Sequence, residues 1–102
     1  MAAALTTLER IPAGLSYERF CADARAIAAA AWNIVIVGEA ARHVPPEVRL
    51  RYPHIPWAPM AGMRNILVHQ YYEIEPGILW DTALRDAPPL VPLLEALLAR
   101  EV

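Results

Sequence analysis

One short stretch of the chain, Met63 to Tyr72, gathers side chains that could do chemistry. It contains Arg64, Asn65, His69 and Tyr71 around three consecutive apolar residues. A guanidinium is a permanently charged fork of donors that matches a phosphate, and an imidazole suits acid–base work near neutral pH. The two groups suffice for metal-independent cleavage of RNA, with His69 moving a proton and Arg64 neutralising charge that develops on the phosphate.

Helix geometry sorts these side chains onto different faces. Arg64 and Tyr71 lie seven residues apart and share one face, whereas Asn65 and His69 share another. Arg64 and His69 are separated by about 140° on an ideal helix, so they cannot converge from one straight helix. Two alternatives stay open. Either the helix ends or distorts near His69, or the same helix of a second chain completes the site across a two-fold axis.

A simpler interpretation stands beside the catalytic one. An Arg and a His on an amphipathic helix are commonly surface or interface residues, and tyrosines there are commonly interface aromatics. No metal or cofactor is expected, because the three His lack the spacing of zinc ligands and Cys21 has no second Cys to join it. The sequence also lacks a glycine loop that would cradle phosphates.

Charge is distributed unevenly along the 102 residues, whose formal net charge is −2. Residues 42–72 carry four Arg against one Glu and hold all three His. Residues 73–102 carry two Arg against six acids. The basic middle segment therefore indicates an anionic partner such as RNA, although the total charge by itself argues against one.

Length and composition predict one domain over residues 1–102. Hydrophobic residues make up 57% of the chain, a surplus that favours a homodimer or another protein interface. A single cysteine and the lack of a secretory signal predict a cytoplasmic protein. The longest uncharged apolar run, Ala26–Val37, is shorter than the roughly 18 residues of a membrane span, so no membrane is expected.

The periodicity predicts an all-α fold, an up-and-down bundle of four to five helices with short connections. Ser16 is expected to cap a helix that runs with a break near Asp23, and residues 52–56 are expected to be extended because two of them precede proline. Gly62 is expected to permit a close approach inside its helix. The expected helices cover residues 2–11, 16–43, 57–71, 75–86 and 88–101, with a short turn of helix at residues 47–51.

Several motifs resemble those of the HepT-like proteins of the HEPN superfamily. The central one is Arg64-Asn65-x-x-x-His69-x-Tyr71, which is similar to the family's Arg-x4-His-x-Tyr signature. Three further segments resemble family motifs in the same order: Val37-Gly38-Glu39-Ala40-Ala41, Arg51-Tyr52-Pro53-x-Ile55-Pro56-Trp57 and Ala61-Gly62-Met63-Arg64-Asn65. The first helix is shorter than is usual in that family.

The resemblance implies a helical bundle that forms homodimers, and a ribonuclease toxin of a toxin–antitoxin module. It implies Arg64 and His69 as the catalytic pair, Asn65 as a supporting polar residue and Tyr71 as the acceptor of AMP. The AMP would come from a small MntA-like nucleotidyltransferase antitoxin, which would silence the toxin. The alternative function is a non-catalytic helical subunit that binds a nucleotidyltransferase, which the acidic total charge and short first helix favour.

Overall fold

Capping side chains set two helix starts where the sequence predicts them. The computed structural model describes residues 1–70 and 73–101. Ser16 Oγ accepts a hydrogen bond from the backbone N–H of Arg19 at 3.2 Å, at the start of α2 (Tyr17–Cys21). Asp23 Oδ1 accepts from the N–H groups of Arg25 and Ala26, both at 3.0 Å, at the start of α3 (Ala24–Arg42). The predicted break near Asp23 is thus confirmed.

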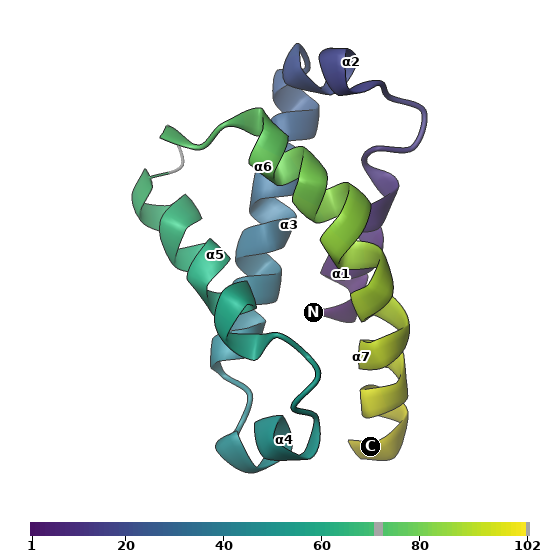
Figure 1. Ribbon diagram of the computed structural model, residues 1–102, viewed down its shortest axis with the longest axis vertical. Helices are drawn as coiled ribbons and strands as arrows, with labels where there is room; N and C mark the ends of the chain where they lie inside the picture. Colours follow the sequence, from purple (N-terminus) through teal and green to yellow (C-terminus); the bar gives the residue numbers. More distant parts are fainter. Residues whose placement is uncertain (71–72, 102) are drawn as a thin grey trace.

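Four helical rods run alternately up and down, as expected (Figure 1). The rods are α1 (Ala2–Arg10), α3, α5 (Trp57–Gln70) and a last rod made of α6 (Pro76–Asp81), η2 (Thr82–Asp86) and α7 (Ala87–Glu101). The short α2 lies at one end of the bundle, and α4 (Pro46–Arg51) lies at the other (Figure 1). The described part of the chain contains no strand, so the all-α prediction is confirmed.

The helix α3 organises the core. It packs against α1, α2, α5 and α6, and it buries Ala30, Ile34, Val37 and Ala41. Within the described residues it is also the one helix long and apolar enough to cross a membrane by length and mean hydropathy. Core helices of other proteins pass the same test, and α3 packs against four neighbours with 28% of this stretch buried.

The helices α3 and α5 approach each other closely at Gly38. A Cβ built there would overlap the Cβ of Arg64 and lie 2.6 Å from the carbonyl oxygen of Met60. A Cβ built at Gly62 would meet no atom within 4 Å. The expectation that Gly62 permits a close approach is therefore wrong within one chain. The close contact is instead at Gly38 of α3, where the lack of a side chain lets the backbone of α5 pack directly against that of α3.

The connection before α5, residues 52–56, forms a turn, whereas the sequence predicts it to be extended. The N–H of Ile55 donates to the carbonyl of Tyr52 at 3.2 Å, which closes a turn, and the N–H of Trp57 donates to the carbonyl of Ile55 at 2.8 Å. Tyr52 keeps the non-helical backbone expected before a proline, with φ −127° and ψ 61°. Pro53 follows it at the second position of the turn, where its fixed φ is favourable.

The last two predicted helices form one continuous rod. Pro88 and Pro89 have no amide hydrogen, so the carbonyls of Leu84 and Arg85 lack their usual donors four residues ahead. The chain widens into the π-helical turn η2, in which the N–H of Ala87 donates to the carbonyl of Thr82. Instead of a break before Pro88, this wider turn joins α6 to α7 (Figure 1).

Candidate active site

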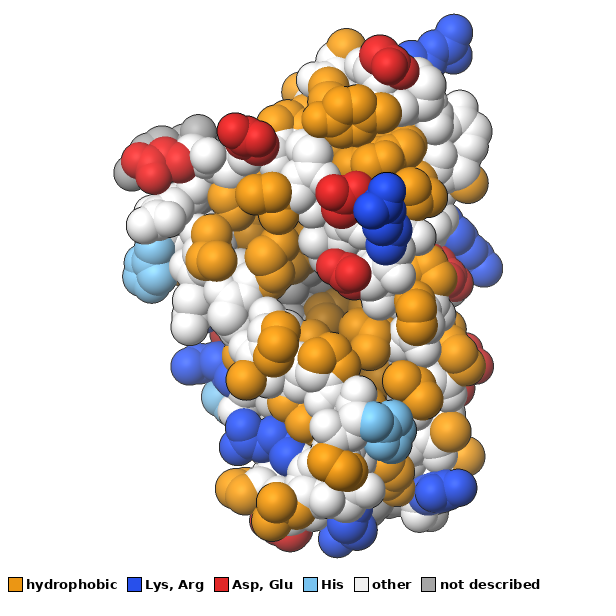
Figure 2. All heavy atoms as spheres, viewed as in Figure 1, with side chains coloured by type: hydrophobic (Ala, Val, Ile, Leu, Met, Phe, Trp, Pro, Cys, Tyr) orange, Lys and Arg blue, Asp and Glu red, His pale blue; other side chains and the backbone are white. Residues whose placement is uncertain are grey.

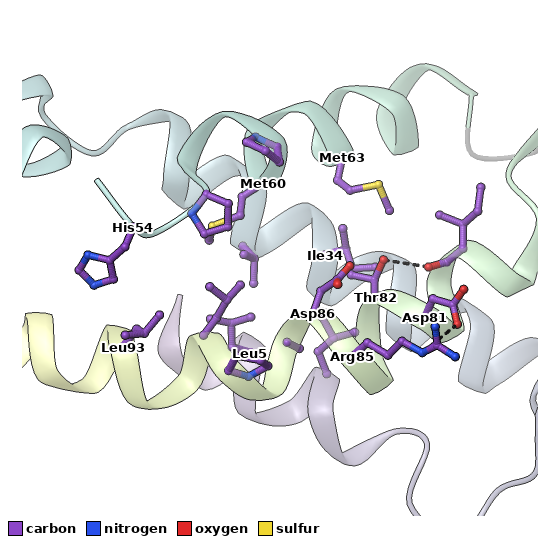
Figure 3. A pocket seen from close by; sticks show the side chains of 18 residues that line it. Leu5, Ile34, His54, Met60, Met63, Asp81, Thr82, Arg85, Asp86 and Leu93 are labelled. Carbon is purple, nitrogen blue, oxygen red and sulfur yellow. Dashed lines mark hydrogen bonds and ion pairs between the residues drawn. The ribbon is translucent and has the colours of Figure 1, made fainter. Parts of the chain in front are cut away.

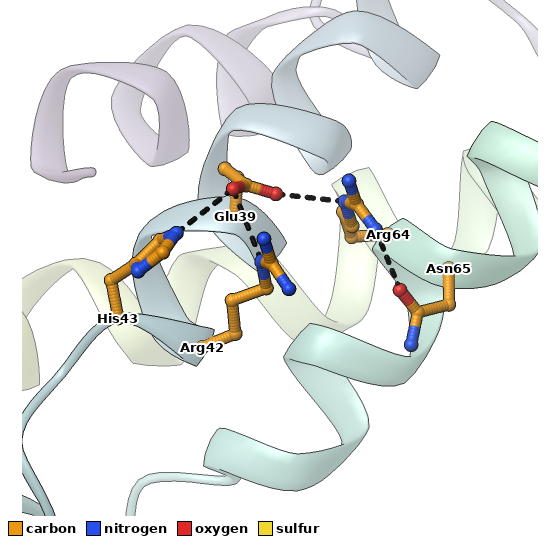
Figure 4. A network of polar contacts seen from close by, with 5 residues as sticks. All are labelled: Glu39, Arg42, His43, Arg64 and Asn65. Carbon is orange, nitrogen blue, oxygen red and sulfur yellow. Dashed lines mark hydrogen bonds and ion pairs between the residues drawn. The ribbon is translucent and has the colours of Figure 1, made fainter.

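Arg64 is anchored at the seam between α3 and α5. Its Nε lies 2.8 Å from Oε2 of Glu39, which extends from α3 directly after the close approach at Gly38 (Figure 4). Its Nη1 donates to Oδ1 of Asn65 at 2.8 Å. The guanidinium is thus held at two of its three nitrogens, while 22% of the side chain is exposed.

The contact between Glu39 and Arg64 is an ion pair without an aligned hydrogen bond. Both Oε2 and Nε are shielded from solvent, and neither has a hydrogen-bond partner despite their separation of 2.8 Å. The Nε–H is not directed at the oxygen, so the charges attract without the directional part of the interaction. The contact is therefore weaker than an aligned bidentate pair would be.

The other oxygen of Glu39 contacts two more side chains, at the last residue of α3 and at the residue that follows it (Figure 4). Oε1 accepts from Nε of Arg42 at 3.1 Å and lies 3.0 Å from Nε2 of His43. These hydrogen bonds, first that of Arg42 and then that of His43, lower the pKa of the Glu39 carboxyl. One carboxylate is therefore surrounded by two arginines and a histidine, and the cluster keeps an excess of positive charge.

His69 lies away from this cluster on the same helix. The helix α5 keeps α-helical geometry through Gln70, so the chain does not distort before His69. Arg64 and His69 therefore stay about 140° apart around the axis and about 7.5 Å apart along it. The His69 side chain is exposed in the last turn. The structure thus brings together Arg64 and Asn65 and leaves His69 on another face. Tyr71 lies outside the described residues.

Sequence reasoning missed three residues of this cluster. Glu39, Arg42 and His43 are spaced i, i+3 and i+4, a spacing that places them on one side of a helix. That pattern could have indicated a local charge cluster, and Glu39 belongs to one of the segments that resemble family motifs. Its pairing with Arg64 could not be read locally, because the two residues are 25 positions apart. Elsewhere among the described residues, no three His, Cys, Asp or Glu side chains are grouped as a metal site.

Comparison with known proteins identifies the family of this chain. The family described as Ribonuclease HepT-like matches residues 1–97. The chain is 32% identical to a protein named probable ribonuclease HepT from Thermococcus cleftensis, over 95% of this chain and 88% of that protein. It is 34% identical to a candidate RNase from Caldanaerobacter subterraneus subsp. tengcongensis, over 92% of this chain and 83% of that protein.

A candidate RNase from Methanocaldococcus jannaschii is 34% identical over 74% of this chain and 63% of its own length. No solved structure gives a significant match. The match to the family covers nearly the whole described bundle, including Arg64, Asn65 and His69. The chain belongs to the HepT-like ribonuclease family.

Proposed function

We propose that this chain is a metal-independent endoribonuclease, the toxin component of a HepT/MntA-type toxin–antitoxin module. The observation that carries the proposal is the fixed and partly exposed guanidinium of Arg64, in a chain that belongs to a ribonuclease family. Glu39 and Asn65 hold this guanidinium, part of it faces solvent, and a second arginine lies beside it. Such a preorganised cation stabilises the negative charge that develops on a phosphate in the transition state.

In the proposed reaction the 2′-hydroxyl of a ribose attacks the adjacent phosphorus atom. The new bond between the 2′-oxygen and phosphorus forms as the bond to the 5′-oxygen breaks. This leaves a 2′,3′-cyclic phosphate and a 5′-hydroxyl. His69 takes the proton from the 2′-hydroxyl or gives one to the leaving oxygen, and solvent water makes the other transfer. Arg64 neutralises the charge that builds on the non-bridging oxygens. No step requires a metal ion.

A homodimer would complete this site, because one chain does not bring Arg64 and His69 together. An exposed apolar surface borders the Glu39–Arg64 pair. Trp32 lies two turns before Glu39 on the same side of α3 and is 64% exposed, and Val68 lies one turn after Arg64 and is 47% exposed. Exposed aromatic and aliphatic side chains of this kind are typical interface anchors. Pairing this surface with its copy would set α5 of each chain beside that of the other.

Mixing two inactive variants tests the shared site. Arg64→Ala and His69→Ala are each expected to abolish cleavage of a labelled single-stranded RNA. A heterodimer of the two variants keeps Arg64 on one chain and His69 on the other, so one site is intact and activity returns. Activity of both single variants at the wild-type level would refute the mechanism. Inactive variants that do not complement each other would refute the shared site and leave a site within one chain.

The proposed control of this activity is AMP transfer to Tyr71 by an MntA-like nucleotidyltransferase in the cytoplasm. The phenol oxygen would attack the α-phosphorus of ATP, pyrophosphate would leave and the phenolic proton would pass to solvent. Tyr71 follows Arg64 by seven residues, so the added phosphate would compete with RNA near Arg64. Mass spectrometry after incubation with the nucleotidyltransferase and ATP should find one AMP group on Tyr71. Modification confined to another residue would refute this route.

The alternative function is a non-catalytic subunit that binds a nucleotidyltransferase. The separation of Arg64 and His69 within one chain favours it, because a binding subunit needs no convergence of the two. A stable complex with the nucleotidyltransferase would then form without RNA cleavage by the free chain. Growth arrest on expression that His69→Ala relieves would support the ribonuclease instead.

A further inference from the structure

A long apolar groove opens on the flank of α5 that faces away from Glu39. It lies between α5 on one side and the α6–η2–α7 rod on the other, and α1 and α3 form its floor (Figure 3). Its volume is about 700 Å³, within the range of preformed binding sites. In the space-filling view the hollow lies in the middle of one face, with apolar side chains at its bottom (Figure 2).

The groove exists because the bundle is open along one edge. The helix α5 packs extensively against α3, and α1 packs against both α3 and α7, but no comparable packing joins α5 to α6 or α7 among the described residues. In a closed bundle every helix has two such neighbours. Along its long wall the groove runs from Ile78 to Leu93, about 22 Å at the rise of a helix. That length is about four helical turns.

The two walls differ in charge. The α5 side is lined by His54 and by prolines and methionines, without an acidic or arginine side chain. The α6–η2 side carries Asp81, Arg85 and Asp86. Asp81 and Arg85 approach no closer than 3.9 Å and both side chains are exposed, so their pairing is weak, and Asp86 has no ion-pair partner in the part of the chain that the structure describes. The groove is thus apolar at its centre and acidic along one wall.

We propose that this groove is a docking site for an amphipathic helix of a partner protein, with lysine or arginine on the flank that meets Asp81 and Asp86. A row of apolar side chains at i, i+3, i+4 and i+7 would fill the channel, as in other helix-in-groove contacts. The ridges of such a helix fit between two helices better than an extended strand does, since neither wall offers a strand edge. Met60 and Met63 give the α5 wall an adaptable surface.

The positions of Asp81 and Asp86 determine how far apart the basic residues of the partner helix must be. Asp81 and Asp86 are five residues apart, about one turn of the rod in its wider π-helical segment. Basic residues four or five positions apart on the docked helix would meet both. Docking would also give α5 a second packed flank, next to the one that carries Arg64. The site is separate from the RNA site, so this proposal does not depend on the proposed function.

The three methionines allow a direct test in the full-length chain. Met60 and Met63 line the groove and Met1 does not, so methionine methyl NMR contains its own reference. The probe is a capped 15-residue helical peptide with leucines at i, i+4, i+7 and i+11 and lysines on both flanks. A matched peptide carries glutamate in place of lysine. The lysine peptide should shift the Met60 and Met63 signals saturably and leave Met1 unchanged.

The charge contribution is tested with surface variants. Asp81→Asn combined with Asp86→Asn should lower the affinity for the lysine peptide about fivefold to tenfold, the size expected of two exposed ion pairs. Glu95→Gln, an exposed change on α7 outside the groove, should have no effect. Circular dichroism should show all these variants folded, because the substituted side chains are exposed.

Several results would overturn the proposal. Equal binding of the lysine and glutamate peptides would remove the acidic wall as a determinant. Shifts of all three methionines together would indicate binding elsewhere or unfolding. Shifts produced by uncharged octyl glucoside but not by the lysine peptide would make the groove a small-molecule site. Changes of Met60 and Met63 on dilution without any peptide would assign the groove to a second copy of the chain.

Discussion

Gly38 and Arg64 are in direct contact across the seam between α3 and α5. A Cβ at position 38 would overlap the Cβ of Arg64 and lie 2.6 Å from the carbonyl oxygen of Met60. The absence of a side chain at Gly38 therefore sets the distance between the two helices. It also sets the reach from Glu39, the next residue, to the guanidinium of Arg64.

Gly38→Ala is expected to lower the free energy of unfolding by about 1–3 kcal/mol, because an added methyl group forces the helices apart. Cleavage should fall by up to about a hundredfold as Arg64 is displaced. Gly62→Ala is the matched control, since nothing lies within 4 Å of its added Cβ. That variant should gain about 0.5–1 kcal/mol from better helix propensity. Denaturant titration measures both, and a Gly38→Ala variant as stable as wild type would contradict the packing argument.

Glu39→Gln should make the stability of the fold less dependent on pH in the acidic range. The pKa of Glu39 is lowered in the folded chain, chiefly by the hydrogen bond from Arg42. A carboxyl with a lowered pKa stabilises the fold fully above its unfolded pKa, about 4.5. That contribution is lost as the pH falls through the lowered folded value. The wild type should therefore have the higher Tm at pH 7, and the difference should shrink below about pH 4.5.

Glu47→Gln is the control for that series, because Glu47 is an exposed acid on α4 that makes no ion pair among the described residues. Its Tm difference from wild type should stay small throughout the titration. A constant difference between wild type and Glu39→Gln from pH 7 to pH 3 would show that Glu39 does not titrate as a paired group.

Arg64→Lys keeps the positive charge but loses the planar fork that reaches Glu39, Asn65 and a phosphate at once. Cleavage is expected to fall about 10²–10³-fold, the usual loss for a donor that stabilises transition-state charge. Arg25→Lys, at the exposed start of α3, is the control and should cleave at the wild-type rate. Steady-state kinetics on a fluorogenic RNA gives the comparison. Full activity of Arg64→Lys would mean that charge alone suffices.

Trp32→Ala should weaken the proposed homodimer by about thirtyfold, as removal of a central aromatic anchor typically costs 2 kcal/mol or more. Sedimentation velocity over a range of concentrations measures the shift toward monomer. Cleavage should be lost at low protein concentration and return at high concentration. Leu50→Ala, at an apolar residue on α4 that is 80% exposed, is the control and should not change self-association. An unchanged dimer in Trp32→Ala would place the interface elsewhere.

Much of the fold could be predicted because its signals are local. Ser16 and Asp23 cap helices through bonds that span two or three residues, so residue type and position suffice to identify them. The connection at residues 52–56 shows the limit of such reasoning. The rule for residues before proline correctly excludes helix at Tyr52, yet it does not distinguish an extended strand from the turn that forms.

The sequence by itself determined where most of the helices lie and the faces on which Arg64, Asn65 and His69 lie, because the 3.6-residue repeat fixes those relations within one helix. Only the tertiary structure decided that Glu39 is the partner of Arg64 and that Gly38, rather than Gly62, lies at a close approach between two helices. The register between two helices depends on which distant side chains interlock across them, and no local pattern records it. The open edge between α5 and α7 has the same origin, since it reflects which helices find a packing partner.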